Sequence, residues 1–188
     1  EFREAVIDPF VTSYVQGLTP NPCAVCNRRM KFGMLLDRAR DLGAEKLATG
    51  HYAGLERVHG QKLLVRGADK DKEQSYFLSL LTAGQLERAC FPLAKWRKTD
   101  TYLALQERSL SPVNKQESQE ICFISGKDYR EFVRYNMDSP PPSGPVQDSR
   151  GNVLGTHQGL YRYTIGQRRG LGISYPRPLY VLGKDIEN

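Results

Sequence analysis

The stretch TPNPCAVCN, residues 19–27, decides how the first part of this chain is expected to fold. Two of its residues precede prolines, and a residue before proline avoids the helical conformation, so the stretch predicts an extended turn. From about Cys26, apolar residues recur at helical spacing as far as Leu42, with Asn27 placed to cap the helix and Gly43 to end it. The sequence therefore predicts a sharp turn that leads a Cys-x-x-Cys pair into a helix.

Outward from this turn, the apolar patterns predict helices that alternate with short strands. Residues 1–17 predict a helix, or a strand that leads into one. Beyond the Cys-x-x-Cys helix, the predicted elements are a buried strand at 46–49, a hairpin of 52–58 and 61–66 around His59-Gly60, a buried segment at 74–81, a helix capped by Thr82 and ending near 89, a helix from Thr99 or Asp100 to about 108, a buried strand at 120–124 and a helix at 128–136.

The composition changes at SPPPSGP, residues 139–145, which cannot form a helix or a central strand and predicts a linker or a rigid turn. The sequence beyond it is rich in glycine and in strand-forming residues, at 146–154, 159–173 and 179–182. We therefore expect an α/β architecture over residues 1–126 and a small α+β module over residues 127–188.

The overall composition is that of an ordinary globular protein. The 188 residues are 39% hydrophobic and 26% charged, which excludes wholesale disorder, collagen-like repeats and a coiled coil. The apolar runs are too short to cross a bilayer and the first residues lack a signal-peptide pattern, so we expect a cytoplasmic protein without membrane association. The net charge of +6 favours an anionic partner only slightly.

The four cysteines do not resemble a disulfide scaffold in a chain of this length. For Cys23 and Cys26, three interpretations stay open: two small buried side chains, half of a zinc site with no second Cys-x-x-Cys to complete it, or a redox pair at a helix start. Cys122 lies in a predicted strand, and Cys90 has apolar neighbours and is interpreted as structural. We expect no metal site.

A sharper interpretation concerns the reactivity of Cys26. The prediction places it at a helix N-terminus with Arg28, Arg29 and Lys31 close by. The helix dipole and these cations favour a thiolate over a thiol, and the thiolate is the nucleophilic form. Cys26 is therefore the candidate reactive cysteine.

Two further runs carry candidate binding residues. ATGHY, residues 48–52, places Gly50 and His51 at the end of a predicted strand, where ligands bind in open α/β sheets, although a plain turn would have the same sequence. The polar run at 71–77 is by itself a solvated loop. Basic residues lie beside aromatic ones at 95–98, and again at 162 and 168–169. They could bind phosphates and stack on bases, or they could equally form a solvent-exposed face.

Taken together, these segments resemble the tRNA-specific 2-thiouridylase family, whose members put sulfur on the wobble uridine of certain tRNAs. The matching runs occur in the order of the family and cover nearly the whole chain: TPNPCAVCN with Lys31-Phe32, ATGHY, DKEQSYFL at 71–78, ESQEICFI at 117–124, and GTHQG at 155–159 leading to YTIGQR at 163–168. No single run is decisive, whereas the set is highly specific. The resemblance implies a partial adenine-nucleotide-hydrolase-like (PP-loop ATPase) domain at 1–126, followed by the central α+β module of the family.

The resemblance also implies a mechanism. In the family, ATP, with magnesium, adenylates the C2 oxygen of the uridine, and a sulfur-relay protein or a cysteine desulfurase loads a persulfide onto the cysteine that matches Cys122. A second cysteine, matching Cys26, is the nucleophile that releases the sulfur, and the disulfide formed between the two is later reduced. ATP, tRNA and a persulfide sulfur donor are thus the implied cosubstrates and partners.

Other family roles transfer only to matching positions. Gly50 corresponds to a backbone contact with ATP. The turn that contacts the target base corresponds to Asn21, Pro22 and Cys23, and the tRNA contacts correspond to His51, Lys72, Glu73 and Gln74. Two of these positions depart from the family pattern. Cys23 stands where some relatives have an Asp that is assigned a role in acid/base chemistry, and Glu73 stands where Asp is common.

The sequence contains neither the family's Ser-Gly-Gly-x-Asp-Ser phosphate loop nor its closing β-barrel. We therefore expect an internal piece of such an enzyme that alone neither adenylates nor thiolates tRNA. Two other functions stay open: a non-catalytic RNA-binding piece whose Cys-x-x-Cys is structural or holds zinc, and a thiol oxidoreductase acting on proteins. The oxidoreductase would form a disulfide between Cys23 and Cys26, and the thiouridylase one between Cys26 and Cys122.

Overall fold

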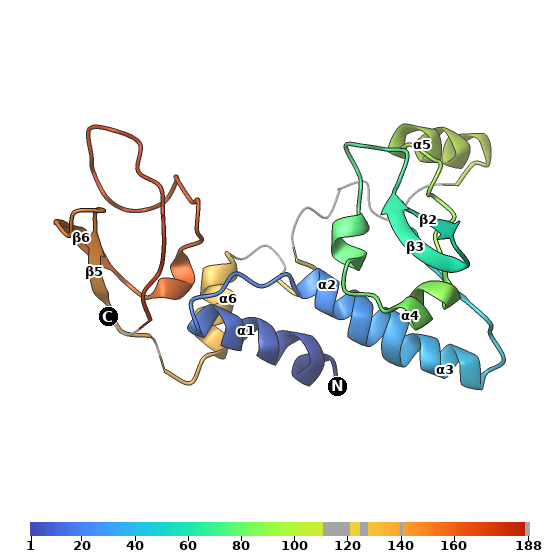
Figure 1. The fold of residues 1–188 in the computed structure, drawn as a ribbon, viewed down its shortest axis with the longest axis horizontal. Coiled ribbons are helices and arrows are strands. Elements are labelled where there is room, and N and C mark those ends of the chain that lie inside the picture. The colour runs from blue at the N-terminus through green and yellow to red at the C-terminus, as the bar shows by residue number, and fades with distance from the viewer. Residues whose placement is uncertain (111–120, 125–127, 140, 187–188) are drawn as a thin grey trace. The chain divides into compact units, whose positions relative to one another are not determined.

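The computed structural model describes residues 1–110, 121–124, 128–139 and 141–186 (Figure 1). The chain forms two compact units. The first unit holds residues 1–6 and 21–119, and the second unit holds residues 7–20 and 120–188. The expected domain boundary at 126–127 lies outside the described residues.

A helical run with a kink at Gly33 forms one side of the first unit: α2 (Pro22–Cys26), the π-helix η2 (Asn27–Leu35) and α3 (Leu36–Asp41). The run begins at Pro22, because a proline suits the first helical position and the side chain of Asn21 accepts a hydrogen bond from the Ala24 N–H at 3.2 Å. The prediction that the helix starts at Cys26 under an Asn27 cap was therefore wrong by about one turn. Its predicted end is confirmed, since Leu42 closes α3.

The π-helix is stabilised from outside the run. The backbone at Gly33 leaves helical geometry, with φ −100° and ψ −105°. The side-chain amide of Gln85 donates to the carbonyl oxygens of Arg28 and Phe32, at 2.8 and 2.9 Å. Such carbonyls need an outside donor where the regular helical ladder is disturbed.

The strands of the first unit form two small sheets. β1 (Leu47–Ala48) pairs in parallel with β4 (Ala89–Cys90), and β2 (Ala53–Val58) pairs antiparallel with β3 (Gln61–Arg66). The hairpin prediction is confirmed: its turn residues His59 and Gly60 have φ values of +48° and +81°, as a tight hairpin requires. The predicted strand at 46–49 was too long and is not buried, because Leu47 is half-buried and Ala48 is exposed.

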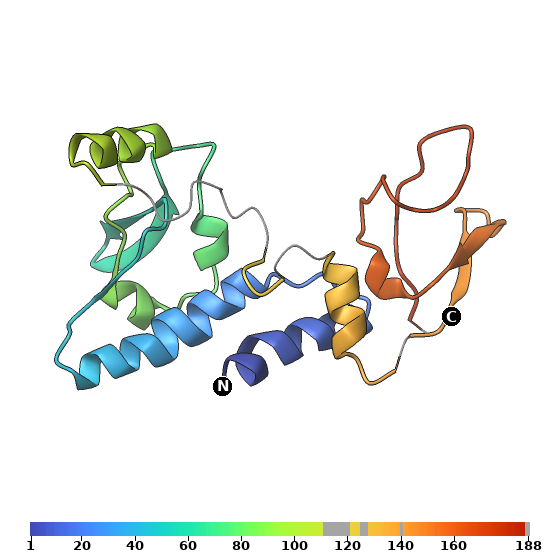
Figure 2. The ribbon, with the colours of Figure 1, turned by 180° about the vertical axis from the view of Figure 1, so that it is seen from behind.

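The remaining helices of the first unit surround the hairpin. They are η3 (Ser75–Leu78, a 3-10 helix), α4 (Ala83–Arg88) and α5 (Lys98–Glu107). Figures 1 and 2 show the hairpin of β2 and β3 between the helical run and α5. The core beneath it consists of Phe32, Ala53, Leu78, Leu81, Leu86, Ala89 and Phe91.

Capping chemistry explains where two of these helices begin. Thr82 caps α4 as predicted, in a reciprocal pair of hydrogen bonds with Gln85. α5 begins earlier than predicted: Asp100 accepts a hydrogen bond from the Arg97 N–H at 3.0 Å, and therefore sits one turn inside the helix. The predicted buried segment at 74–81 is buried only at Leu78 and Leu81.

The second unit is built around α1 (Asp8–Val15), which continues from the π-helix η1 (Arg3–Ile7), together with α6 (Tyr129–Asn136) and the 3-10 helix η4 (Leu160–Arg162). Its core consists of Phe10, Val11, Tyr14, Ile124, Val133 and Tyr161. The helices predicted at 1–17 and 128–136 are confirmed, the latter with Asp128 accepting from the Arg130 N–H at 3.0 Å.

Strand predictions for the second unit were partly wrong. β5 (Gly144–Gln147) and β6 (Val153–His157) form a hairpin around the region expected to be rich in strand-forming residues, and Pro145 is tolerated because this sheet has only two strands. Residues 121–124 form a turn rather than the predicted strand, and a hydrogen bond of 2.8 Å from the Ile124 N–H to the Ile121 carbonyl closes it. Glu120 of that predicted strand and Pro140 of the predicted linker lie outside the described residues. Segments 159–173 and 179–182 form no strands. The predicted fold class is confirmed: an α/β unit and a small α+β unit.

Candidate functional site

The two cysteines of the Cys-x-x-Cys motif lie on the first two turns of the helical run. Cys23 lies in the first turn, directly after Pro22, and Cys26 ends α2; both thiols are half-buried. The helix dipole acts most strongly on the first turn, so the N-terminal position predicted for Cys26 belongs to Cys23. Cys26 lies one turn further along the helix, as the last residue of α2.

The helix that carries Cys26 is fixed to η3 by a buried amide. Asn27 is 2% exposed, and its Nδ2 donates to the carbonyl oxygen of Phe77 at 2.8 Å. Its Oδ1 accepts no hydrogen bond from the described residues. The sequence prediction treated Asn27 as a helix cap, whereas the structure uses it to join the Cys26 helix to the segment that follows the 71–74 loop.

His51 lies beyond the carboxyl end of β1 and is half-buried beside Thr49 and Phe91. Its Nδ1 is 2.8 Å from the Thr49 hydroxyl oxygen, and its ring meets the Phe91 ring edge-on with centroids 6.0 Å apart. Burial, and to a smaller extent the positive charge of Lys31, lowers the pKa of His51 to about 4. His51 is therefore a neutral imidazole at physiological pH.

Gly50, beside His51, is open on the side where a side chain would project. A Cβ built at Gly50 would meet only Leu93 Cδ1, at 3.8 Å, which is ordinary contact. Packing among the described residues therefore does not require a glycine at this position. If a glycine is required at position 50, the reason would be a ligand that approaches the backbone closely there.

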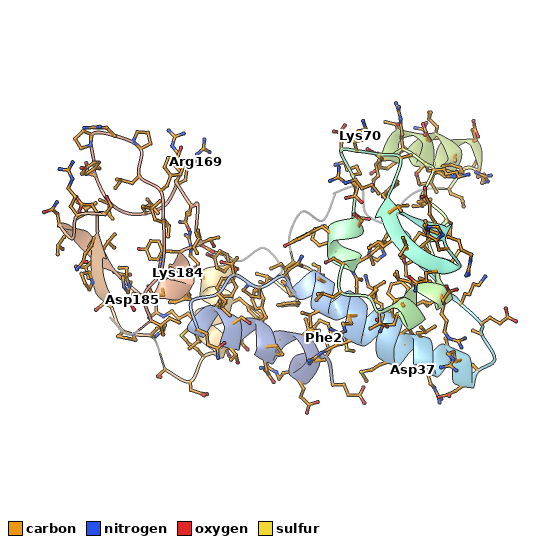
Figure 3. The ribbon with its side chains drawn as sticks, viewed as in Figure 1. Phe2, Asp37, Lys70, Arg169, Lys184 and Asp185 are labelled. Atoms are coloured by element: carbon orange, nitrogen blue, oxygen red, sulfur yellow. The ribbon has the colours of Figure 1, made fainter. Side chains whose placement is uncertain are left out.

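The loop before Glu73 is organised by one carboxylate. Asp69 Oδ1 accepts hydrogen bonds from the Asp71 and Lys72 N–H groups at 3.1 and 3.2 Å, and its Oδ2 accepts from the Lys98 N–H at 2.8 Å. These backbone donors, that of Lys98 foremost, hold the pKa of Asp69 below its ordinary value. Figure 3 shows Lys70 on this loop, beside α5. Asp69 thus ties the start of α5 to the loop that presents Lys72.

Glu73 and Gln74 use their side chains inside the fold. Glu73 Oε1 accepts from the Ser75 N–H at 2.7 Å, at the start of η3. Gln74 Oε1 accepts from the Tyr52 N–H at 3.0 Å, while the Gln74 N–H donates to the Tyr52 carbonyl oxygen at 3.0 Å. This exchange brings the 71–74 loop to the strand end that carries Gly50 and His51.

Within the first unit, the structure therefore joins three of the predicted segments. Asn27 links the Cys26 helix to η3, and Gln74 links the loop to Tyr52 and so to His51. Cys122 lies in the turn of the second unit, where its side chain is exposed. All four cysteines are free thiols.

Sequence reasoning missed Asp69, and it gave Lys31 and Asn27 roles other than those they have in the structure. Lys31 is half-buried, and its charge helps to lower the pKa of His51. An Asp followed by two more polar residues is a turn signal that could have identified Asp69 as an organiser of the loop. No sequence signal indicates that the charge of Lys31 acts on His51, because this effect depends on how the first unit folds.

We also searched the described residues for a metal site and for a membrane-spanning helix. No group of three or more His, Cys, Asp or Glu side chains is placed there to hold a metal ion. No helix in the described part of the chain is both long and apolar enough to traverse a lipid bilayer.

Comparison with known proteins gives matches over the whole chain. Residues 1–126 match the model of the tRNA methyl transferase HUP domain, and residues 130–188 match that of the tRNA methyl transferase PRC-barrel domain. Three proteins named tRNA-specific 2-thiouridylase MnmA are similar to this chain. The protein from Nitratidesulfovibrio vulgaris (strain DSM 19637 / Miyazaki F) is 54% identical, and the match covers 100% of this chain and 54% of the relative. The protein from Oleidesulfovibrio alaskensis is 52% identical over 98% of this chain and 53% of the relative, and the protein from Geobacter metallireducens is 50% identical over 100% of this chain and 51% of the relative.

The chain thus spans about half the length of the curated relatives that it matches. The two matched domains follow one another in the order expected from the sequence, an α/β HUP domain and then a small module. The fold, the motif set and these matches agree, and the chain belongs to the tRNA-specific 2-thiouridylase family.

Proposed function

We propose that this chain forms part of a cytoplasmic tRNA-uridine 2-sulfurtransferase, which replaces the C2 oxygen of the wobble uridine with sulfur at the expense of ATP. The observation that carries the proposal is the match of the whole chain, at 50–54% identity, to proteins named as tRNA-specific 2-thiouridylases. In this proposal residues 1–126 belong to the ATP-dependent catalytic domain and residues 127–188 to the central module.

The proposed chemistry needs two thiols with different roles. ATP, as its magnesium complex, adenylates the C2 oxygen and releases pyrophosphate. A sulfur-relay protein or a cysteine desulfurase loads Cys122 as a persulfide, a role that the exposure of Cys122 supports. The Cys26 thiolate attacks the Cys122 sulfur, a Cys26–Cys122 disulfide forms, and hydrosulfide leaves. Hydrosulfide adds at C2 and displaces AMP, and an external dithiol returns two electrons to the disulfide.

The base and the tRNA would be held by the first unit. We assign the target base to Asn21, Pro22 and Cys23, at the N-terminus of the Cys26 helix, and ATP to the backbone at Gly50. The proposed tRNA contacts are His51, Lys72, Glu73 and Gln74. Support comes from the hydrogen bonds of Asn27 and Gln74, which hold the helix, the strand end and the loop in one arrangement.

The test is a set of serine variants of the protein expressed from its complete natural gene, in a bacterial strain lacking its own thiouridylase. We expect Cys26→Ser and Cys122→Ser each to abolish wobble 2-thiouridine, measured by mass spectrometry of digested tRNA. Cys90→Ser is the matched control and is expected to retain it. In the Cys26→Ser protein, one extra sulfur atom is expected on Cys122, since the thiol that discharges the persulfide is missing.

Two outcomes would contradict the proposal. Normal thiolation by either the Cys26 or the Cys122 variant would remove the two-thiol mechanism. A disulfide between Cys23 and Cys26 in the oxidised protein, with Cys122 still free, would favour a thiol oxidoreductase instead. Peptide mapping of the oxidised protein without reduction separates these pairings.

A further inference from the structure

The basic run KWRK at residues 95–98 has no role in the mechanism above, yet the structure holds it against a functional loop. Just before the run, the Ala94 carbonyl oxygen accepts a hydrogen bond from the Ala68 N–H at 2.8 Å. At its end, the Lys98 N–H donates to Asp69 Oδ2 at 2.8 Å. Asp69 is the carboxylate that organises the loop described above, so the basic run and that loop lie side by side.

The cations of the run differ in what they contact. Lys98 is half-buried, and its Nζ lies over the rings of Tyr52 and Tyr102, 5.7 and 5.6 Å from their centroids. These cation–π contacts give Lys98 a role inside the fold. Lys95 and Arg97, in contrast, are exposed, and neither forms an ion pair with a carboxylate in the described part of the chain. Two positive charges of the run therefore face solvent.

The loop beside the run adds to this positive charge. Over residues 69–74 and 95–98, the exposed charged side chains are three cations and one carboxylate: Lys70, Lys95, Arg97 and Asp71. Figure 3 shows Lys70 beside α5. Asp100, in the first turn of α5, uses its Oδ2 to accept the Arg97 N–H at 3.0 Å. The excess of exposed cations favours a polyanionic partner at this surface.

An aromatic ring stands between the two exposed cations of the run. Trp96 is the only tryptophan in the sequence, and it is 38% exposed. Tryptophan is highly buried on average, so an indole that faces solvent here is unusual. Its backbone is fixed, because the Trp96 N–H donates to the Leu93 carbonyl oxygen at 3.0 Å. Proteins hold unpaired nucleotides by this combination, in which bases stack on aromatic rings and cations contact the phosphates.

We propose that an α5 basic surface, formed by Lys70, Lys95, Trp96 and Arg97, binds the tRNA. Trp96 stacks on an unpaired base, and the three cations contact the phosphates on either side of it. The inference rests on the proposed function, which supplies the tRNA, and it extends the tRNA contact from the loop at Lys72 to the start of α5. An acidic protein would match the cations as well, but the exposed indole between them favours RNA.

The first test concerns the base stack and uses the protein expressed from its complete natural gene. The probes are an unmodified transcript of a tRNA with uridine at the wobble position and a blunt RNA duplex, which has no unpaired base. We expect Trp96→Ala to bind the transcript roughly tenfold more weakly, since one base–aromatic stack has an effect of that size. Trp96→Phe keeps an aromatic face and is expected to recover most of the loss, and the duplex affinity of Trp96→Ala is expected to change little.

The second test concerns the cations. The double variant Lys95→Gln with Arg97→Gln is expected to bind both RNAs more weakly, with a salt dependence reduced by about two charges. Arg88→Gln is the matched control, because it removes an exposed cation from α4, and it is expected to change little. Thermal unfolding of the double variant is expected to match wild type, since both substituted side chains are exposed.

The indole itself provides a direct measurement. The difference in fluorescence between the wild-type protein and Trp96→Phe isolates the emission of Trp96. We expect this emission to fall as the tRNA transcript is added, because a stacked base quenches an indole. Emission that does not change while tRNA binds would contradict the stack.

Unchanged tRNA affinity in both Trp96→Ala and the double variant would overturn the inference, and equal losses of Trp96→Ala for transcript and duplex would remove the base stack. Thiolation lost only with a protein sulfur donor, at unchanged tRNA affinity, would assign the surface to a protein instead. Failure of the proposed function looks different: the wobble uridine would stay unmodified with the wild-type protein, while tRNA binding would still depend on Trp96.

Discussion

Gln74 and Tyr52 exchange a reciprocal pair of hydrogen bonds: the Tyr52 N–H donates to Gln74 Oε1, and the Gln74 N–H donates to the Tyr52 carbonyl, each at 3.0 Å. A side-chain oxygen here replaces the strand partner that a buried backbone group needs. Gln74 therefore has a structural role beside its proposed contact with tRNA, and the two roles use different atoms of one amide.

The two roles of Gln74 are separable by substitution. Gln74→Met leaves the N–H of the buried Tyr52 unpaired, so we expect the free energy of unfolding to fall by about 1–3 kcal/mol in urea denaturation. Gln74→Glu keeps an acceptor and is expected to stay near wild-type stability, while it loses the amide donor and adds a negative charge that weakens tRNA binding. Equal stability of both variants would refute the structural role.

Gly50 offers a clean test of ligand approach. Because a Cβ at this position meets nothing closer than 3.8 Å, we expect Gly50→Ala to fold with wild-type stability and to bind ATP less tightly. Gly54→Ala is the contrasting variant, since its Cβ would lie 2.8 Å from Val65 Cγ2, and we expect it to be destabilised. Calorimetric titration with ATP beside thermal unfolding distinguishes the two effects. Full ATP affinity in Gly50→Ala would remove Gly50 from the proposed site.

The lowered pKa of His51 leads us to expect that the free energy of unfolding falls in mild acid. Its folded-state pKa of about 4 lies below the ordinary value of 6.5, so the unfolded chain takes up this proton first as the pH falls. The contribution is complete above pH 6.5 and is lost progressively toward pH 4. We expect roughly 1–2 kcal/mol, after allowance for solvent screening at a ring that is only partly buried.

Urea denaturation at several pH values measures this effect. The variant His51→Gln, which titrates no proton here, is expected to show a shallower decline than wild type across that window. His59→Asn, in the exposed hairpin turn, is the control and is expected to follow the wild-type curve. Parallel curves for wild type and His51→Gln would count against a depressed pKa.

We expect substitution of Asn27 to lower the free energy of unfolding for a reason unrelated to its expected role as a helix cap. Asn27→Ala removes a buried side-chain donor to the Phe77 carbonyl, and we expect a loss of about 1–3 kcal/mol. The exposed neighbour provides the comparison, since Arg29→Ala should change stability by no more than about 0.5 kcal/mol. A loss as small for Asn27→Ala as for Arg29→Ala would show that the helix does not depend on this bond.

Local chemistry could be predicted from the sequence wherever neighbours along the chain decide the outcome. Thr82 capped its helix as expected, His59-Gly60 formed the hairpin turn, and Asp128 preceded a helix. The motif set was sufficient to indicate the family, because its runs are specific in residue type and order.

The errors came where tertiary contacts outweigh local patterns. Residues 121–124 alternate like a strand, but Ile124 is drawn into the core of the second unit and the segment closes as a turn. The start of the Cys26 helix was misplaced because both Asn21 and Asn27 are plausible caps. Burial of Asn27 against Phe77 decided between them.

The sequence by itself determined the order of motifs, the helix caps at Thr82 and Asp128 and the identity of the candidate cysteines, all of which depend on residues near one another in the chain. Only the tertiary structure decided that Asn27 pairs with the Phe77 carbonyl and that Gln74 pairs with Tyr52. These pairs join residues 50 and 22 positions apart, and they form because burying Phe32, Ala53 and Leu78 in one core brings their neighbours together.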